Sequence, residues 1–281
     1  WCLDTTHPRT QEYIRDVVAA FVSMGYDYLK LDFLYAAAYR GNHYDPSTTG
    51  AERVRKALQL IRKAAGKKTF LLACGSPLFP AAGIVDGMRI SMDVNSIWKG
   101  NYQAALLRDR NFPTARGALL NSIVRSAFHG RFWLNDPDCL MVRDKNTSLT
   151  LNQTRMLASV MSLTGGMILV SDDLALLEGD RMKLLKQAFD LHKLCARHTP
   201  IPVDLMEHHF PGALYNPAGF LGVWNPTDRP QRLLLSLPPG VSEKSLLRAK
   251  NYWDGSSFAW EMQGKHLSLA MAPFESAVAV L

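Results

Sequence analysis

The fold of this chain is decided by the stretch Tyr26-Asp27-Tyr28-Leu29-Lys30-Leu31-Asp32-Phe33, which follows Gly25. Its mostly apolar residues predict a short buried β-strand that ends on a carboxylate. Because side chains alternate between the two faces of a strand, Lys30 and Asp32 lie on one face. Two opposite charges are costly to bury unless their face lines a polar cavity, such as the mouth of a barrel. The stretch therefore predicts a functional carboxylate, with a plain buried ion pair as the alternative.

Further short apolar segments end in polar or acidic residues and alternate with helical patterns. The expected strands are residues 26–33, 69–74, 87–93, 131–136 and 167–170, with the tail of another at residues 1–4. Between or after them, helices are expected before Gly25 and over residues 50–65, 102–128 (broken at Pro113), 149–163 and 181–195. This alternation indicates a parallel α/β architecture.

Carboxylates at strand ends favour a (β/α)8 TIM-type barrel, whose active site is built from the loops after its strands. Such a barrel needs about eight strands, so the barrel is expected to lack its first strands and to expose a strand edge. An open doubly wound sheet would explain the strand count but not the carboxylates. The chain also begins at Trp1 rather than at a methionine, which fits an N-terminally truncated barrel.

The pattern changes after Pro200, where short apolar runs are separated by turn residues. We therefore predict two domains: residues 1–200 form the barrel, and residues 201–281 form a small antiparallel β-sandwich. Its expected strands are residues 219–226, 232–238, 251–255 and 276–281, and Trp224 and Trp253 are expected in the core.

Composition and charge restrict the partners. The net charge of +7 raises the question of nucleic acid, but the basic residues are spread along helices at helical spacing and no nucleic-acid motif accompanies them. The densest group is expected to be the solvated face of a helix, and its members are Arg53, Arg55, Lys56, Arg62, Lys63, Lys67 and Lys68. No apolar run is long enough to cross a bilayer. We expect neither nucleic acid nor membrane as a partner.

The cysteines indicate a reducing compartment. All four are widely separated and form no CxxC pair, so neither a zinc site nor a dense disulfide framework is expected. A cytoplasmic location is predicted. Several aspartates could be taken for ligands of calcium or magnesium, but they are expected to fix strand-end loops instead; they are Asp136, Asp138, Asp172 and Asp173. We predict no metal and no organic cofactor.

Asp32 and Asp93 end different strands of the predicted barrel and should face one mouth. Most glycoside hydrolases use a pair of carboxylates for catalysis. In the retaining mechanism they stand about 5 to 5.5 Å apart; one attacks the anomeric carbon, and the other protonates the leaving oxygen and later activates water. Lys30 would help to keep Asp32 ionised, as a nucleophile requires.

Motifs in residues 1–200 resemble α-galactosidases of glycoside hydrolase family 36. They are Lys30-Leu31-Asp32-Phe33, Cys74-Gly75-Ser76-Pro77, Asp86-Gly87-Met88-Arg89 with Asp93 four residues on, and Phe132-Trp133-Leu134-Asn135-Asp136-Pro137-Asp138. The resemblance implies hydrolysis of terminal α-D-galactosides of the raffinose type by a two-carboxylate double displacement.

By that resemblance Asp32 is the nucleophile and Asp93 the general acid/base. Lys30, Cys74 and Arg89 match positions that line the galactose subsite, and Trp98 is expected to form a wall on the leaving-group side. The run Val94-Asn95-Ser96-Ile97-Trp98 departs from the family's pattern. The family's acidic residues on the first barrel strands and its large N-terminal β domain have no counterpart.

Three alternatives stay open at this point. The protein could transfer α-galactosyl groups to a sugar acceptor, or act on α-N-acetylgalactosaminides. In the third, the chain is a non-catalytic truncated fragment. A homo-oligomer of the full-length protein also stays open.

Overall fold

The computed structural model describes residues 2–107, 109, 112–264 and 266–281. Contacts divide the chain into two compact units. The first unit is Trp1–Ile90 with Gly130–Asp136, and the second is Ser91–His129 with Pro137–Leu281. This division differs from the predicted domain boundary between residues 200 and 201, which stays a prediction.

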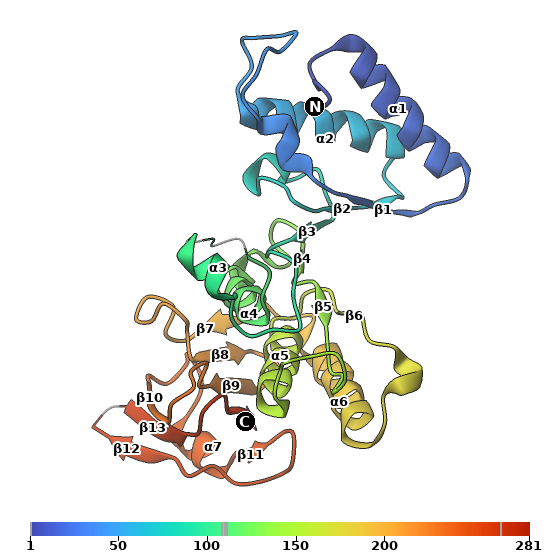
Figure 1. Cartoon of the computed structure of the whole chain (residues 1–281). Coiled ribbons are helices and arrows are strands. Elements are labelled where there is room, and N and C mark those ends of the chain that lie inside the picture. Colours follow the sequence, from blue (N-terminus) through green and yellow to red (C-terminus); the bar gives the residue numbers. More distant parts are fainter. Residues whose placement is uncertain (1, 108, 110–111, 265) are drawn as a thin grey trace. The chain divides into compact units, whose positions relative to one another are not determined.

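The first unit is built on a parallel four-stranded sheet in the order β1-β2-β3-β4 (Figure 1). Its strands are Tyr28–Leu31 (β1), Phe70–Ala73 (β2), Gly87–Arg89 (β3) and Leu134–Asp136 (β4). Each neighbouring pair is parallel, as the sequence predicts. The strand order follows the chain without the reversal that defines a doubly wound sheet, so these strands favour the winding of a barrel.

Helices α1 (Pro8–Ser23) and α2 (Gly50–Ala65) belong to the same unit, and a 3₁₀ turn, η1 (Leu34–Ala38), follows β1. Helix α2 begins at a capping box in which Thr49 and Glu52 bond each other's backbone N–H groups. The other 3₁₀ turn of this unit is η2 (Phe79–Ala81).

Two arginines of α2 correct the prediction of a solvated basic face. Arg53 is buried, and its guanidinium donates to the carbonyl oxygens of Ala37, Thr48 and Tyr39. Arg62 pairs with Asp86 and donates to the carbonyl oxygen of Ile84. Helical spacing places these residues on the helix but does not show that carbonyl groups converge on them. Arg53 therefore holds the end of η1 against α2.

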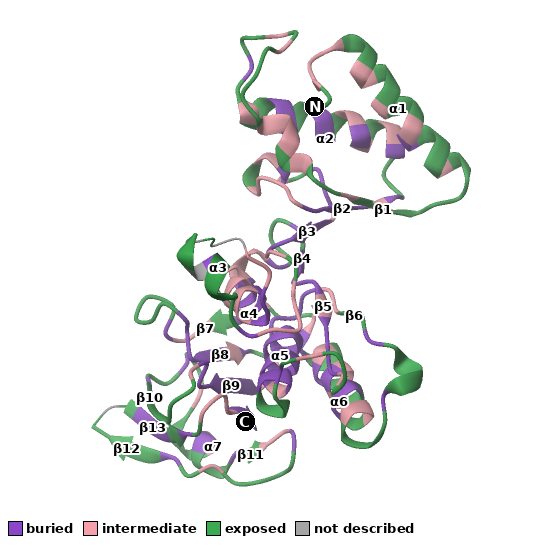
Figure 2. Ribbon diagram, in the orientation of Figure 1, coloured by how far each residue is buried: buried purple, intermediate pink, exposed green. Residues whose placement is uncertain are grey.

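Strand β1 is less buried than the sequence predicts. Tyr28 and Lys30 are exposed, and Leu29 and Leu31 are only partly buried, because β1 lies at the edge of the described sheet and pairs there with β2. Helix α1 is also largely exposed: Val18 is its buried residue (Figure 2). The expected exposed strand edge is thus present at β1.

The second unit contains helices, a parallel strand pair and two antiparallel sheets. Its helices and 3₁₀ turns are α3 (Tyr102–Leu106), α4 (Ala115–Val124), η3 (Ser126–Phe128), α5 (Leu151–Leu163), η4 (Leu174–Leu176), α6 (Gly179–Cys195) and α7 (Glu243–Arg248). The parallel pair is β5 (Cys139–Leu140) with β6 (Leu169–Val170). In the expected helical region over residues 102–128, α3 precedes the predicted break at Pro113, and α4 and η3 follow it.

The antiparallel strands confirm the β-rich C-terminal region. One sheet has the order β11-β14-β9-β8-β7, and the other has the order β10-β13-β12. Their bounds are β7 (Ile201–Pro202), β8 (Ala213–Asn216), β9 (Phe220–Trp224), β10 (Gln231–Leu235), β11 (Lys250–Asn251), β12 (Glu261–Gln263), β13 (His266–Met271) and β14 (Ser276–Val280). A shared core of residues such as Leu221, Leu235 and Leu267 joins the sheets.

Helix α5 and the larger antiparallel sheet share the main core of the second unit (Figure 2). Leu157 and Met161 of α5 belong to the same cluster as Trp224 and Val278 of the sheet. Trp224 and Trp253 are buried, as predicted. The Nε1–H of Trp253 donates to the Ser159 hydroxyl at 3.0 Å, so this core ring also has its polar atom satisfied.

Strands are shorter than the sequence predicts at several places. The segment expected over residues 87–93 is a strand only at Gly87–Arg89, so Asp93 lies in a loop four residues beyond it. Residues 2–4 form no strand, and Trp1 lies outside the described residues. In the part of the chain that the structure describes, no helix is both long and apolar enough to span a membrane.

Gly222 in β9 provides a test of the α5 packing. A Cβ at this position would lie 2.3 Å from Leu163 Cδ1 and 2.7 Å from Trp224 Cζ3, so Gly222→Ala should lower the free energy of unfolding by about 1–3 kcal/mol. Urea unfolding followed by tryptophan fluorescence measures the change. Gly41→Ala is the matched control, because a Cβ there meets nothing within 4 Å. Equal stability of the two variants would contradict this packing.

Candidate active site

Asp32 follows directly after β1, on the face that also carries Tyr28 and Lys30. The parallel register pairs Leu31 with Ala73, so Asp32 lies beside Cys74 at the carboxyl ends of β1 and β2. The Cys74 N–H donates to the Leu31 carbonyl oxygen at 2.7 Å, which extends the pairing to this point. The predicted shared face of Lys30 and Asp32 is confirmed.

A tight turn fixes the backbone after Asp32. Phe33 has φ +55°, a left-handed conformation that is unusual for a bulky residue, and its N–H donates to Asp32 Oδ1 at 2.8 Å. Gly75 has φ +51°, and a Cβ there would lie 3.2 Å from the Tyr35 ring. The Tyr35 N–H donates to the Gly75 carbonyl oxygen at 2.7 Å. Glycine is needed at position 75 both for its backbone conformation and for this close approach.

The surroundings of Asp32 favour its ionised form. Partial burial raises the pKa of Asp32, but hydrogen bonds from the Cys74 thiol and the Phe33 N–H, together with the charges of Lys30 and Arg89, outweigh it and lower the pKa. The same environment acts on the thiol in the opposite direction. Burial and the hydrogen bond to Asp32 raise the pKa of Cys74 to about 11. At neutral pH a protonated thiol therefore donates to an ionised carboxylate.

Arg89 is held by a buried ion pair. Its Nε lies 3.0 Å from Asp136 Oδ2, and both side chains are almost fully buried. The two residues end the adjacent parallel strands β3 and β4. Asp136 thus holds the Arg89 side chain, and Arg89 contributes positive charge to the Asp32 environment. The predicted role of Asp136 in fixing a strand-end loop stays a prediction.

Asp93 belongs to the second unit, where its side chain is exposed in the loop after β3. The next residue is fixed by Asp138: the Val94 N–H donates to Asp138 Oδ2 at 2.9 Å. Asp138 is buried and has φ +77°, a conformation that aspartate and asparagine tolerate better than most residues. The predicted loop-fixing role of Asp138 is confirmed, while the pairing of Asp93 with Asp32 stays a prediction.

Trp98, expected as a wall on the leaving-group side, lies in the hydrophobic core. It is 6% exposed, and its ring meets that of Phe274 edge to face at 5.5 Å between centroids. Its place at the sugar stays a prediction.

The other strand-end aspartates also hold loops. Asp172 accepts hydrogen bonds from the backbone N–H groups of Val142 and Arg143 and pairs with the Arg143 guanidinium. Asp173 accepts from the Ala175 N–H and caps η4. Over the described ranges, no group of three or more His, Cys, Asp or Glu side chains could hold a metal ion.

Comparisons with solved structures find similar α-galactosidases, although no protein-family model matches the chain. An α-galactosidase of Thermus thermophilus in complex with p-nitrophenyl α-D-galactopyranoside is 32% identical, with a TM-score of 0.59 over 67% of this chain and 37% of that chain. These two thirds of the chain resemble an α-galactosidase in sequence as well as in structure.

Two fungal structures cover more of the chain at lower identity. α-Galactosidase I of Mortierella vinacea is 13% identical, with a TM-score of 0.63 over 95% of this chain and 70% of that chain. An α-galactosidase of Saccharomyces cerevisiae with raffinose is 12% identical, with a TM-score of 0.63 over 93% and 73%. At this identity the two structures support the fold. The chain spans less than two fifths of the length of the Thermus protein.

The sequence did not predict the hydrogen bonds that keep Asp32 ionised. Cys74 was expected only to line the subsite, whereas its thiol is a donor to the carboxylate. The signal was available in part, because Cys74 ends the segment that follows β1 in the predicted parallel order.

Replacing Cys74 tests its effect on Asp32. Cys74→Ala removes a donor to the ionised carboxylate, so the pKa of Asp32 should rise. Carbon-13 NMR titration of the Asp32 carboxyl group measures it, and Cys74→Ser, which keeps a hydroxyl donor, is the control. An unchanged pKa in Cys74→Ala would show that the thiol does not stabilise the charge.

Asp138 is tested separately through the Asp93 loop. Asp138→Ala leaves the Val94 N–H without its acceptor and puts alanine at φ +77°, so the free energy of unfolding should fall by about 1–3 kcal/mol and amide exchange at Val94 should accelerate. Asp138→Asn keeps an acceptor, and asparagine tolerates the left-handed backbone. Its free energy of unfolding should therefore fall less than that of Asp138→Ala. Native-like exchange at Val94 in Asp138→Ala would refute this role.

Proposed function

We propose that the chain is the catalytic part of a retaining α-galactosidase of glycoside hydrolase family 36. One observation carries the proposal: Asp32 is an ionised carboxylate at the end of a parallel strand, held by donors from the neighbouring strand end and by its own turn. A nucleophile needs this charge and this fixed orientation. The similarity to the Thermus α-galactosidase supports the choice of substrate.

In the proposed reaction Asp32 attacks the anomeric carbon while the bond from that carbon to the leaving oxygen breaks. Asp93 gives its proton to that oxygen and becomes a carboxylate. It then takes a proton from water, whose oxygen attacks the same carbon and releases Asp32. Two inversions restore the α configuration in the product.

The proposed substrates are terminal α-galactosides, including raffinose-type oligosaccharides. Lys30, Cys74 and Arg89 would line the galactose subsite, and Trp98 would contribute on the leaving-group side. Support comes from the similar structures, since the Thermus protein is also seen with stachyose and the Saccharomyces protein with raffinose. We propose hydrolysis rather than transfer to a sugar acceptor or cleavage of α-N-acetylgalactosaminides.

We further propose that β1 to β4 are part of a closed (β/α)8 barrel, in which additional strands pair with the edge of β1. The sequential strand order and the exposed side chains of Tyr28 and Lys30 support this. A reducing, cytoplasmic setting is proposed from the four free cysteines.

The exposure of Asp32 favours a second candidate, in which the 281-residue chain by itself is non-catalytic. A pocket that does not enclose the sugar loses the binding energy that aligns the reaction. On this view, activity requires a longer protein from the same gene.

The roles of the carboxylates are tested by substitution. Asp32→Asn should lower hydrolysis of p-nitrophenyl α-galactoside by several orders of magnitude, because the amide cannot attack the anomeric carbon. The assay uses the 281-residue chain and the polypeptide encoded by its complete open reading frame, with Asp27→Asn as the matched control. Full activity of Asp32→Asn in a protein that is active without the substitution would refute the assignment.

Added azide separates the two roles. In Asp32→Gly, azide can occupy the space of the carboxylate and attack the anomeric carbon, which gives a β-galactosyl azide. In Asp93→Ala, azide attacks the galactosyl-enzyme and gives the α product. The opposite pairing of variants and products would reverse the roles. Product analysis with a sugar acceptor distinguishes hydrolysis from transfer.

A further inference from the structure

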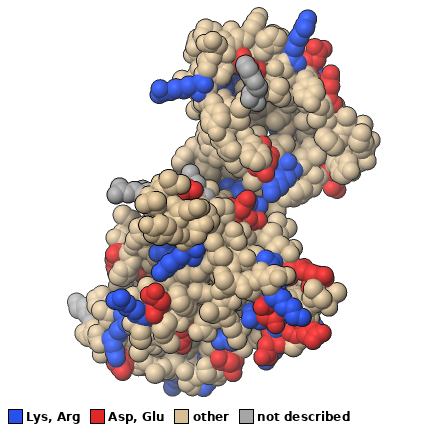
Figure 3. All heavy atoms as spheres, in the orientation of Figure 1, with Lys and Arg blue, Asp and Glu red and all other residues tan. Residues whose placement is uncertain are grey.

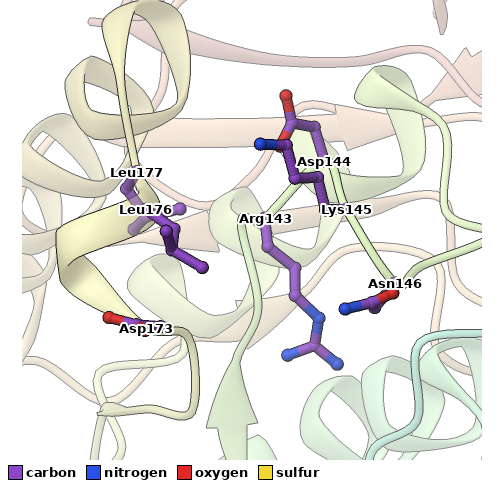
Figure 4. A pocket seen from close by; sticks show the side chains of 7 residues that line it. All are labelled: Arg143, Asp144, Lys145, Asn146, Asp173, Leu176 and Leu177. Carbon is purple, nitrogen blue, oxygen red and sulfur yellow. The ribbon is translucent and has the colours of Figure 1, made fainter.

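A cavity of about 310 Å³ lies at the parallel pair β5 and β6 in the second unit. The loop after β5 contributes residues 143–146, and the loop after β6 contributes Asp173, Leu176 and Leu177. Figure 4 shows Arg143 and Asn146 across the cavity from Asp173 and the two leucines. None of these residues belongs to the predicted catalytic site.

Both loops are fixed by hydrogen bonds before any ligand binds. Asp172 accepts from the Arg143 N–H at 3.1 Å and from Arg143 Nη1 at 3.0 Å. Arg181 donates to the Val142 carbonyl oxygen at 3.2 Å, and Asp173 accepts from the Ala175 N–H at 3.0 Å. The side chains of Arg143 and Asp173 are therefore held in place, which lowers the entropy lost when a ligand orders them.

The charges of the cavity disfavour an anion and a metal ion. The positive charge of Arg143 is balanced by Asp172, and that of Lys145 stands beside Asp144, while Asp173 adds a further negative charge. An anion would be repelled by Asp173. Two lining carboxylates are too few for a site of oxygen ligands, and no metal cluster occurs among the described residues.

A neutral ligand with many hydroxyl groups fits the side chains that line this cavity. Asn146 and the guanidinium of Arg143 can donate, and Asp173 can accept from two hydroxyls. Nη1 of Arg143 is bound to Asp172 and Nε is buried, so a ligand would meet the remaining terminal nitrogen of the guanidinium. Leu176 and Leu177 offer an apolar surface for the C–H face of a pyranose ring.

We propose that this cavity is a binding subsite for one neutral sugar unit of an oligosaccharide. Its volume is at the lower end of the range of about 300–1,000 Å³ for ligand pockets, which suits a single ring. The proposal goes beyond the hydrolytic function, since it concerns binding by loops that carry neither Asp32 nor Asp93.

The test is a titration of the full 281-residue chain with raffinose into the millimolar range, followed by amide NMR. Raffinose should shift the amide signals of residues 143–146 and 173–177. Asn146→Gly keeps the left-handed backbone of φ +53° but removes the amide, and should raise the Kd for this event roughly tenfold, as expected for one or two lost hydrogen bonds. Asn152→Ala, on exposed α5 surface, should leave it unchanged.

Several results would overturn the subsite. These are the absence of shifts in the two loops, equal affinity in Asn146→Gly and the unsubstituted chain, or shifts with sulfate but not with raffinose. Asp32→Asn should leave the loop shifts intact, so loss of the proposed hydrolytic function and loss of this subsite are separate outcomes.

Discussion

The hydrogen bonds between the ends of β1 and β2 are the constraint on which the candidate site depends. They comprise the Cys74 N–H to the Leu31 carbonyl, the Tyr35 N–H to the Gly75 carbonyl, and the Cys74 thiol to Asp32. Because a strand alternates its side chains, a slip of the register by one residue would turn Asp32 to the opposite face. The position and charge of this carboxylate therefore depend on the pairing of two strands as well as on the turn that follows Asp32.

Carboxylates at strand ends divide into two kinds according to what surrounds them. Asp138 and Asp172 accept backbone N–H groups of neighbouring loops, and Asp136 binds a buried arginine. These aspartates satisfy donors that short strands and tight loops leave unpaired. Asp32 differs because its side chain remains exposed although it accepts from the Cys74 thiol and from the N–H of Phe33. A parallel α/β protein thus uses the same residue type for support and for proposed chemistry. On the face of the second unit that Figure 3 shows, Lys and Arg side chains lie beside Asp and Glu side chains rather than in one stripe.

The sequence predicted the parallel order, the shared face of Lys30 and Asp32, and the loop-fixing aspartates, because each depends on periodicity or on residue type near a strand end. It failed where several segments meet. Arg53 looked like part of a solvated face, but carbonyl groups from the end of η1 and from the loop before α2 surround it. β1 looked buried because its residues are apolar, whereas burial depends on what covers the strand. The short pair β5 and β6 and the cavity beside it also depend on contacts between loops that periodicity does not encode.

Helix α5 shows how segments on the two sides of the predicted boundary at residue 200 share one core. Its apolar residues share one core with β9 and β14, so the helical part and the antiparallel part of the second unit are stabilised by the same buried surface. The change of sequence pattern marks a change of secondary structure, but not an end of cooperative packing. The loops that carry Asp93 and the cavity at β5 and β6 belong to this same unit. Their geometry therefore depends on C-terminal strands that carry no predicted catalytic residue.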